Sequence, residues 1–205
     1  INIIDQDAAA VGQMAIDILE ICGLPITPTM ATNIYTAILT DTGGFRHENT
    51  SEACLLAAAK LARLGAQPGD IAGKVYKSRP LTTLKLQAIS LAKMEVSHGG
   101  RLTWATVSRA MLKEAGAVMA ESEGIIDTLN SIAGLEVAIL FKEVNSSITK
   151  ISVRSRGAID AAAFCGGLGG GGHMRAAGAE IQRPMDQAIA LVLGAADDAL
   201  AAIAD

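Results

Sequence analysis

Cysteine is scarce in this sequence, with only three in 205 residues, at Cys22, Cys54 and Cys165. The number is odd, the three are far apart, and no CxxC pair occurs. This pattern excludes a cysteine-rich zinc site of the usual spacing and a disulfide framework. Because cytosolic thiols normally stay reduced, we expect a cytoplasmic protein.

Long apolar runs and an excess of positive charge are also absent. No apolar run reaches the ~18 residues of a membrane-spanning helix, and no signal-peptide pattern is visible, so we expect no membrane segment in this chain. The net charge of −4 argues against a surface coated for general nucleic-acid binding but leaves room for a local basic site. The first residue is Ile1 rather than Met, and residues 1–4 predict a buried strand. We therefore expect the sequence to be part of a longer protein.

Glycine, by contrast, is concentrated in one place, at six of the seven positions 166–172. Each glycine costs about 0.4–1 kcal/mol of stability against alanine where alanine would fit. The run therefore requires positive φ angles or close approach of the backbone to a partner. Bare N–H groups of such a loop, with a helix starting over Met174–Ala177, would hold an anion such as phosphate. A flexible linker is the alternative.

Two nucleotide-binding motifs are excluded at this run. The glycines match GxGxxG, but that motif follows a strand, and residues 159–165 have a helical pattern. A P-loop needs Lys followed by Ser or Thr after its last glycine, where this chain has His173 and Met174. Basic side chains bracket the run: Arg154, Arg156 and Arg175.

A second informative stretch follows a predicted helix that begins at Pro28. Gly43-Gly44 ends this helix and leaves Asp41 at its end. A carboxylate in that position can reach a metal ion through oxygen, or it can close the turn through its side chain. Arg46 is either a phosphate clamp or part of a surface ion pair, and His47 is interpreted as a turn residue.

The remaining pattern predicts an α/β protein, because both halves mix helix and strand. Asp5 or Asp7 is expected to cap the first helix, and Asn49 with Glu52 resembles a capping box. Helices are predicted at 11–22, 28–39, 51–63, 70–77, 81–93, 108–116, 123–132, 159–165 and 184–204. Strands are predicted at 94–98, 101–107, 135–144, 147–154 and 179–182.

The two informative stretches resemble one family. The sequence DTGGFRHENTS over 41–51 resembles the fourth motif of the DHH phosphoesterases. RSRG over 154–157 and GGGGHMRAAG over 169–178 resemble the signature of the associated DHHA1 domain. The resemblance covers essentially the whole chain and is nearest to the NrnA-type oligoribonuclease and pAp phosphatase branch. It implies the C-terminal part of a DHH domain, with a parallel sheet and helices, over 1–78. A connecting helix over 79–93 and a DHHA1 domain with a mixed sheet over 94–205 follow.

The resemblance also implies site residues and a cofactor. Asp41 becomes a metal ligand and catalytic residue, with Arg46 beside it, while the other ligands of two divalent ions, usually manganese, belong to motifs that precede this chain. The residues implied to bind the nucleotide and its phosphate are Arg154, Ser155, Gly170, Gly171, Gly172 and His173.

The implied activity is hydrolysis of short RNA or DNA oligonucleotides to 5′-mononucleotides, or of pAp to AMP and phosphate. We expect this chain alone to bind ligand without turnover. The alternatives are a cyclic-dinucleotide phosphodiesterase of the same superfamily and a non-catalytic nucleic-acid-binding DHHA1 module. Apolar surface around Ile1–Ile4 and Ala31–Leu39 is expected to be exposed and to favour a homodimer.

Overall fold

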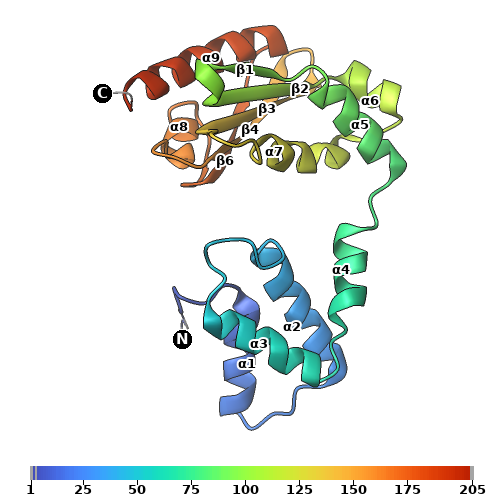
Figure 1. Cartoon of the computed structure of the whole chain (residues 1–205). Coiled ribbons are helices and arrows are strands. Elements are labelled where there is room, and N and C mark those ends of the chain that lie inside the picture. Colours follow the sequence, from blue (N-terminus) through green and yellow to red (C-terminus); the bar gives the residue numbers. More distant parts are fainter. Residues whose placement is uncertain (1, 3, 204–205) are drawn as a thin grey trace. The chain divides into compact units, whose positions relative to one another are not determined.

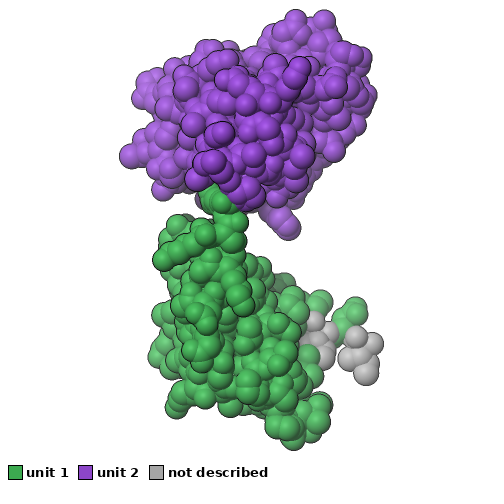
Figure 2. All heavy atoms as spheres, turned by 90° about the vertical axis from the view of Figure 1, so that its right-hand side faces the viewer, with its two compact units in different colours: residues 1–79 green, residues 80–205 purple. Residues whose placement is uncertain are grey.

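The computed structural model describes residues 2 and 4–203 and divides at residue 79 into two units (Figures 1 and 2). Unit 1 comprises residues 1–79 and unit 2 residues 80–205. In the predicted strand over 1–4, Ile1 and Ile3 lie outside the described residues, and Asn2 and Ile4 are not in a strand. Within the described part of the chain, no helix is long and apolar enough to cross a membrane.

The regular elements in the described residues of unit 1 are all helices: α1 (Val11–Ile21), α2 (Pro28–Asp41), α3 (Glu52–Arg63) and α4 (Pro68–Tyr76). The parallel sheet implied for this part is therefore not represented in the residues described. Ala31 and Ile38 of α2 are fully buried against the other helices, so the expectation that this face is exposed is wrong. Large apolar side chains are exposed on α1 and α3 instead: Val11, Ile18, Ile21, Leu55 and Leu56.

Local caps in unit 1 differ from two of the predictions. The N-cap of α1 is Ala10, with no side-chain cap, so neither predicted aspartate caps it. The side chain of Ser51, not Asn49, caps α3 by accepting a hydrogen bond from the Cys54 N–H. Asn49 instead donates to the carbonyls of Ala9 and Asp41, which ties the loop before α3 to the end of α2.

Unit 2 is built on a six-stranded mixed sheet in the order β1-β2-β3-β4-β6-β5. The β2–β3 pair is parallel and the others are antiparallel. The strands are β1 (Glu95–Ser97), β2 (Leu102–Val107), β3 (Val137–Asn145), β4 (Ile148–Ser155), β5 (Gly171–His173) and β6 (Ala176–Ile181). Both predicted hairpins, β1–β2 and β3–β4, are confirmed.

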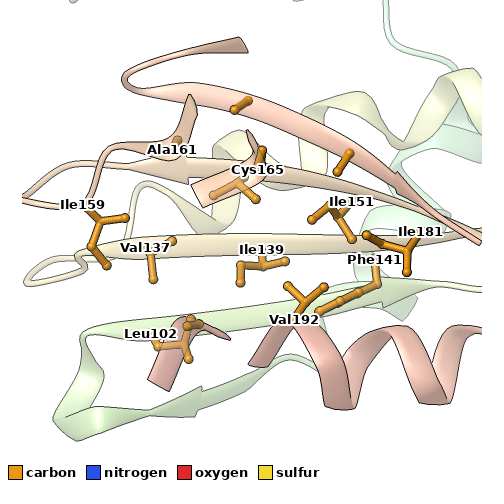
Figure 3. Packing of buried hydrophobic residues seen from close by; sticks show 14 of the residues in the cluster. Leu102, Val137, Ile139, Phe141, Ile151, Ile159, Ala161, Cys165, Ile181 and Val192 are labelled. Carbon is orange, nitrogen blue, oxygen red and sulfur yellow. The ribbon is translucent and has the colours of Figure 1, made fainter. Parts of the chain in front are cut away.

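Helices cover both faces of this sheet (Figure 1). On one side α8 (Ala161–Gly166) and α9 (Met185–Ala201) enclose the apolar cluster shown in Figure 3, which contains Ile139 and Phe141. On the other, α5 (Leu81–Leu91), α6 (Arg109–Ala115) and α7 (Glu123–Leu129) pack on Ala138 and Leu140. Alternate residues of β3 thus serve two cores. We call the two sides the α9 face and the α7 face of the sheet.

The predicted connecting helix belongs to unit 2. Leu86 of α5 is fully buried, and the Ser90 hydroxyl donates to the Thr106 carbonyl on β2 at 2.8 Å. The unit boundary at 79/80 leaves α5 inside the second unit rather than between the two. The correction follows from burial, because one face of α5 covers the sheet.

Candidate functional site

The turn after α2 is held by backbone conformation and by one buried hydroxyl. Gly43, Gly44 and Phe45 all have positive φ, at 57°, 73° and 62°. The fully buried Thr42 donates its hydroxyl to the Ile38 carbonyl at 2.7 Å and accepts the Phe45 N–H at 3.1 Å. The turn is therefore closed by Thr42, and the Asp41 side chain is not required to close it.

Asp41 and Arg46 lie on the exposed side of this turn. Asp41 is the last residue of α2, and its carbonyl accepts a hydrogen bond from Asn49 at 3.3 Å. Arg46 donates through Nε to the Gly43 carbonyl at 2.6 Å, which fixes the guanidinium beside the turn. The His47 ring lies over Gly43, where an added Cβ would collide with Nε2. Both predicted residues are thus accessible to a ligand.

The residues described do not by themselves form a metal site. They contain no group of three or more His, Cys, Asp or Glu side chains placed to hold an ion. A hollow of about 690 Å³ in unit 1 is lined by four carboxylates, from Asp5, Asp7, Asp17 and Glu48, but not by Asp41. A single carboxylate does not fit a two-metal site, so the described residues support no metal-dependent step by themselves.

The glycine run of unit 2 is not the anion nest that the sequence predicts. The N–H groups of Gly167 and Gly170 donate to the carbonyls of Ala163 and Cys165 in the last turns of α8. Met174–Ala177 does not begin a helix, because Ala176 is the first residue of β6, and β5 and β6 form a hairpin. The N–H groups at the start of the run are therefore already used within the protein.

Within the run, three neighbouring glycines differ in whether a side chain would fit. A Cβ on Gly170 would collide with the Gly178 carbonyl oxygen, and one on Gly172 would lie 2.6 Å from the Ala176 oxygen. Gly172 also has a φ of 149°. A Cβ on Gly171 would meet nothing within 4 Å. Gly170 and Gly172 are thus required by packing against β6, whereas Gly171 is open.

The strand register assembles a row of side chains on the α7 face. Arg154 pairs with Ala176, and Ala176 pairs with His173. Paired residues point to the same face, so Arg154 and His173 flank the small Ala176 at two strand spacings, about 10 Å between their Cα atoms. We call these three residues the Arg154 row.

Next to the Arg154 row lies a row with almost no side chains, formed by Ser152, Gly178 and Gly171. Three predicted site residues, Arg154, Gly171 and His173, thus converge on one flat and partly exposed surface. This surface lies beyond the part of the α7 face that α7 covers, because Ala176 and Gly178 are only half-buried.

Other predicted residues support this surface from behind. Ser155 is buried on the α9 face, and its hydroxyl donates to the Met174 carbonyl at 3.0 Å. It therefore holds the β5–β6 turn, and a direct contact of Ser155 with a ligand stays a prediction. Arg156 donates to the carbonyls of Asn130 and Ile132, which caps the end of α7.

Arg154 itself is held by an acidic residue. Its Nε donates to the Asp127 carboxylate of α7 at 3.2 Å, with exposed side-chain fractions of 29% and 67%. Such a partly exposed ion pair contributes only about 0–1 kcal/mol. An incoming phosphate can therefore replace Asp127 on Arg154 at little cost.

A third row completes the surface, and sequence reasoning missed it. Lys142, Lys150 and Glu180 follow in register on β3, β4 and β6. Desolvation lowers the pKa of Lys142, Glu123 opposes this effect, and the positive charges of Lys150 and Arg154 add to it. We call these three residues the lysine row. They line a shallow hollow of about 330 Å³ together with Gly170 and Gly178.

We call the row of Ser152, Gly178 and Gly171 the glycine floor. On the α7 face, positively charged side chains thus lie at both ends of this floor, in the Arg154 row and in the lysine row. Such a surface suits a ligand with anionic groups and a flat or small middle, as in a nucleotide. This fold is a mixed α/β domain, and this face is its candidate site for an anionic ligand.

Comparisons with known proteins show the family of this chain and two of its relatives. The DHHA1 domain model matches residues 99–203, so the chain belongs to the DHHA1 domain family. It is 32% identical over 201 residues to the bifunctional oligoribonuclease and PAP phosphatase NrnA of Thermus thermophilus, covering 98% of this chain and 60% of the relative. The Bacillus subtilis protein of the same name is 26% identical over 185 residues, covering 87% and 56%.

A solved structure shows the same fold. It is an exopolyphosphatase-related protein of Bacteroides fragilis, with a TM-score of 0.89 at 24% identity, and the match covers 97% of this chain and 59% of that one. The chain spans about three fifths of the length of these relatives. The mixed α/β fold is confirmed.

Proposed function

We propose that this chain is part of an NrnA-type phosphoesterase that hydrolyses short oligonucleotides to 5′-mononucleotides and pAp to AMP and phosphate. Unit 2 binds the nucleotide and its phosphate. The Arg154 row carries the proposal, because it puts a guanidinium and an imidazole on either side of a floor without bulky side chains. The names of the two NrnA relatives support the substrate class.

In this proposal, Arg154 and His173 bind the phosphate from two sides. The guanidinium offers a planar pair of donors that matches phosphate oxygens. His173 donates one ring N–H, and Gly171, in the neighbouring row, leaves space for the sugar or base beside them. Ser155 and Gly172 position His173 by holding the β5–β6 hairpin.

Asp41 and Arg46 are proposed as residues of the reacting end. Asp41 would supply one carboxylate to a pair of divalent ions, which we expect to be manganese, and Arg46 would bind a phosphoryl oxygen. When bound, such ions activate water and stabilise the oxygens around phosphorus. Because the described residues offer this one carboxylate without a ligand cluster, the chain alone should bind ligand without turnover.

The test is a titration of the 205-residue chain with pAp, following the amides of Gly171 and His173 by NMR. Saturable shifts should be lost in Arg154→Ala and in His173→Ala. Asp127→Asn should raise affinity by roughly 2–5-fold, because it removes a competitor of about 0.5–1 kcal/mol. Lys113→Met, on the exposed side of α6, is the control for loss of one charge.

The outcomes separate clearly. Saturable binding with this ranking of variants supports the proposal. Equal affinity for pAp in the unchanged chain, Arg154→Ala and His173→Ala would contradict it, as would no binding at millimolar pAp. Robust manganese-dependent hydrolysis by this chain alone would overturn the expectation that it lacks turnover.

A further inference from the structure

Two lysines face each other across β3 and β4 on the α7 face of the sheet. Lys142 and Lys150 are register partners, so their Cβ atoms lie about 5 Å apart. Like charges directly opposite one another destabilise a sheet. An anion beside such a pair relieves this repulsion.

The surrounding protein supplies only part of that compensation. Glu180 on β6 is 3.6 Å from the Lys150 ammonium, with exposed side-chain fractions of 44% and 56%. Glu123 at the start of α7 acts on Lys142 from a distance, while Arg154 on β4 repels it. The lysine row therefore has a net charge of one positive unit, and its more buried member, Lys142, faces a like charge.

The row also lines a hollow that continues the glycine floor. The hollow of about 330 Å³ is bounded by both lysines and Glu180, by Gly178 of β6, and by Gly170, which immediately precedes β5. The Arg154 row, the glycine floor and the lysine row thus form one continuous surface on the α7 face. Its positively charged side chains lie at its two ends.

We propose that the lysine row is a second phosphate site, which binds a phosphate of the same oligonucleotide whose end is held by the Arg154 row. This inference rests on the proposed function and adds to it a preference for chain length. Lys142 and Lys150 are binding residues in this site, and Glu180 orients Lys150.

The strand geometry sets the length that fits. Arg154 and Lys150 are four residues apart on β4, or about 13 Å between their Cα atoms. In a stacked strand with a rise of about 3.4 Å per nucleotide, 13 Å corresponds to roughly four steps, and an extended strand needs fewer. Ligands of about three to five nucleotides therefore reach both rows, and a mononucleotide reaches only one.

The test measures binding of 5′-phosphorylated oligoadenylates of one to five nucleotides to the full 205-residue chain by calorimetry. Affinity should rise with length and level off once both rows are engaged. In Lys142→Met the rise should disappear, with unchanged affinity for the mononucleotide. Each phosphate contact contributes about 0.7 to the slope of log affinity against log salt for a single strand, so this slope should fall by about 0.7 for the longest ligand only.

Two further variants and a stability readout separate binding from structure. Lys142→Arg should keep the length dependence, and Lys113→Met should leave it unchanged. Trp104 is the only tryptophan in the chain and lies in β2 of unit 2, so its fluorescence follows the unfolding of this unit. Lys142→Met should not lower the thermal midpoint, because it removes a desolvated ammonium opposite another lysine.

Several results would overturn the second site. These are an equal loss of affinity at every length in Lys142→Met, a loss matched by Lys113→Met, or a lower thermal midpoint. If the mononucleotide binds and the affinity does not rise with oligonucleotide length, the second site is refuted but the proposed function is not. No binding at any length would remove both.

Discussion

The glycines of the 166–172 run offer a sharp test, because Gly171 and Gly172 are neighbours with opposite environments. An alanine Cβ at Gly172 would lie 2.6 Å from both the Ala176 oxygen and the Ala177 Cα, at a φ of 149°. An unfavourable φ costs about 1–3 kcal/mol, and overpacking costs a further 1–3 kcal/mol or so. Because β5 is a three-residue edge strand that can separate from β6, we expect Gly172→Ala to lower the free energy of unfolding by about 2–4 kcal/mol.

Gly171→Ala is the matched control. The same methyl group is added one residue away, where it meets nothing within 4 Å at an ordinary φ. Its effect on the free energy of unfolding should stay within about 0.5 kcal/mol. Both variants lose the same glycine freedom in the unfolded chain, so the difference between them reports the φ strain at residue 172 together with its contact with β6.

The assay is urea unfolding followed by the fluorescence of Trp104. Its ring packs edge-on against Phe141, with centroids 5.9 Å apart, at the side of the apolar cluster that contains Phe141. Equal unfolding free energies for the two variants would refute the reasoning. The binding assay should show a second contrast, since the methyl group of Gly171→Ala stands on the ligand floor and should weaken pAp binding without loss of stability.

Two further predictions concern other parts of the chain. Glu121 accepts hydrogen bonds from Thr82, the Val118 N–H and Thr83, which lower its pKa. Its stabilising effect should thus be present above its unfolded pKa of about 4.3 and be lost as the pH falls through the lower folded pKa. The gap in thermal midpoint between the unchanged chain and Glu121→Gln should accordingly shrink toward pH 3. The exposed apolar side chains of α1 and α3 predict self-association, which light scattering should detect as a mass above that of one chain at high concentration; a clean monomer would contradict it.

The fold of unit 2 was largely predictable because its signals are local. A continuous apolar run predicted β3, alternating apolar residues predicted β4, and the break at Gly99-Gly100 predicted the first hairpin. The start of β6 was mispredicted as a helix because Met174–Ala177 has good helix formers. The pairing of β6 with β4 overrides that propensity, since Ala177 and Ala179 face the α9 core.

The candidate site was predictable only in part, because a sequence motif does not show toward which face of the sheet each of its side chains points. Arg154 and Ser155 are adjacent in sequence, yet alternation along β4 sends one to the α7 face and the other into the core. Gly170, Gly171 and Gly172 were predicted as equivalent ligand contacts. Packing against β6 accounts for two of them and leaves Gly171 open.

The lysine row was hidden from sequence reasoning by a register shift. The β3–β4 hairpin pairs Asn145 with Ile148 at its turn, and an uninterrupted ladder from that pair would place Lys142 opposite Ile151. The shift between Glu143 and Asn145 adds one residue on β3, so Lys142 faces Lys150 instead. Without this irregularity the apolar Phe141 and Ile151 would not share the α9 face. The same extra residue that lets the core close therefore makes the two lysines register partners beside the glycine floor.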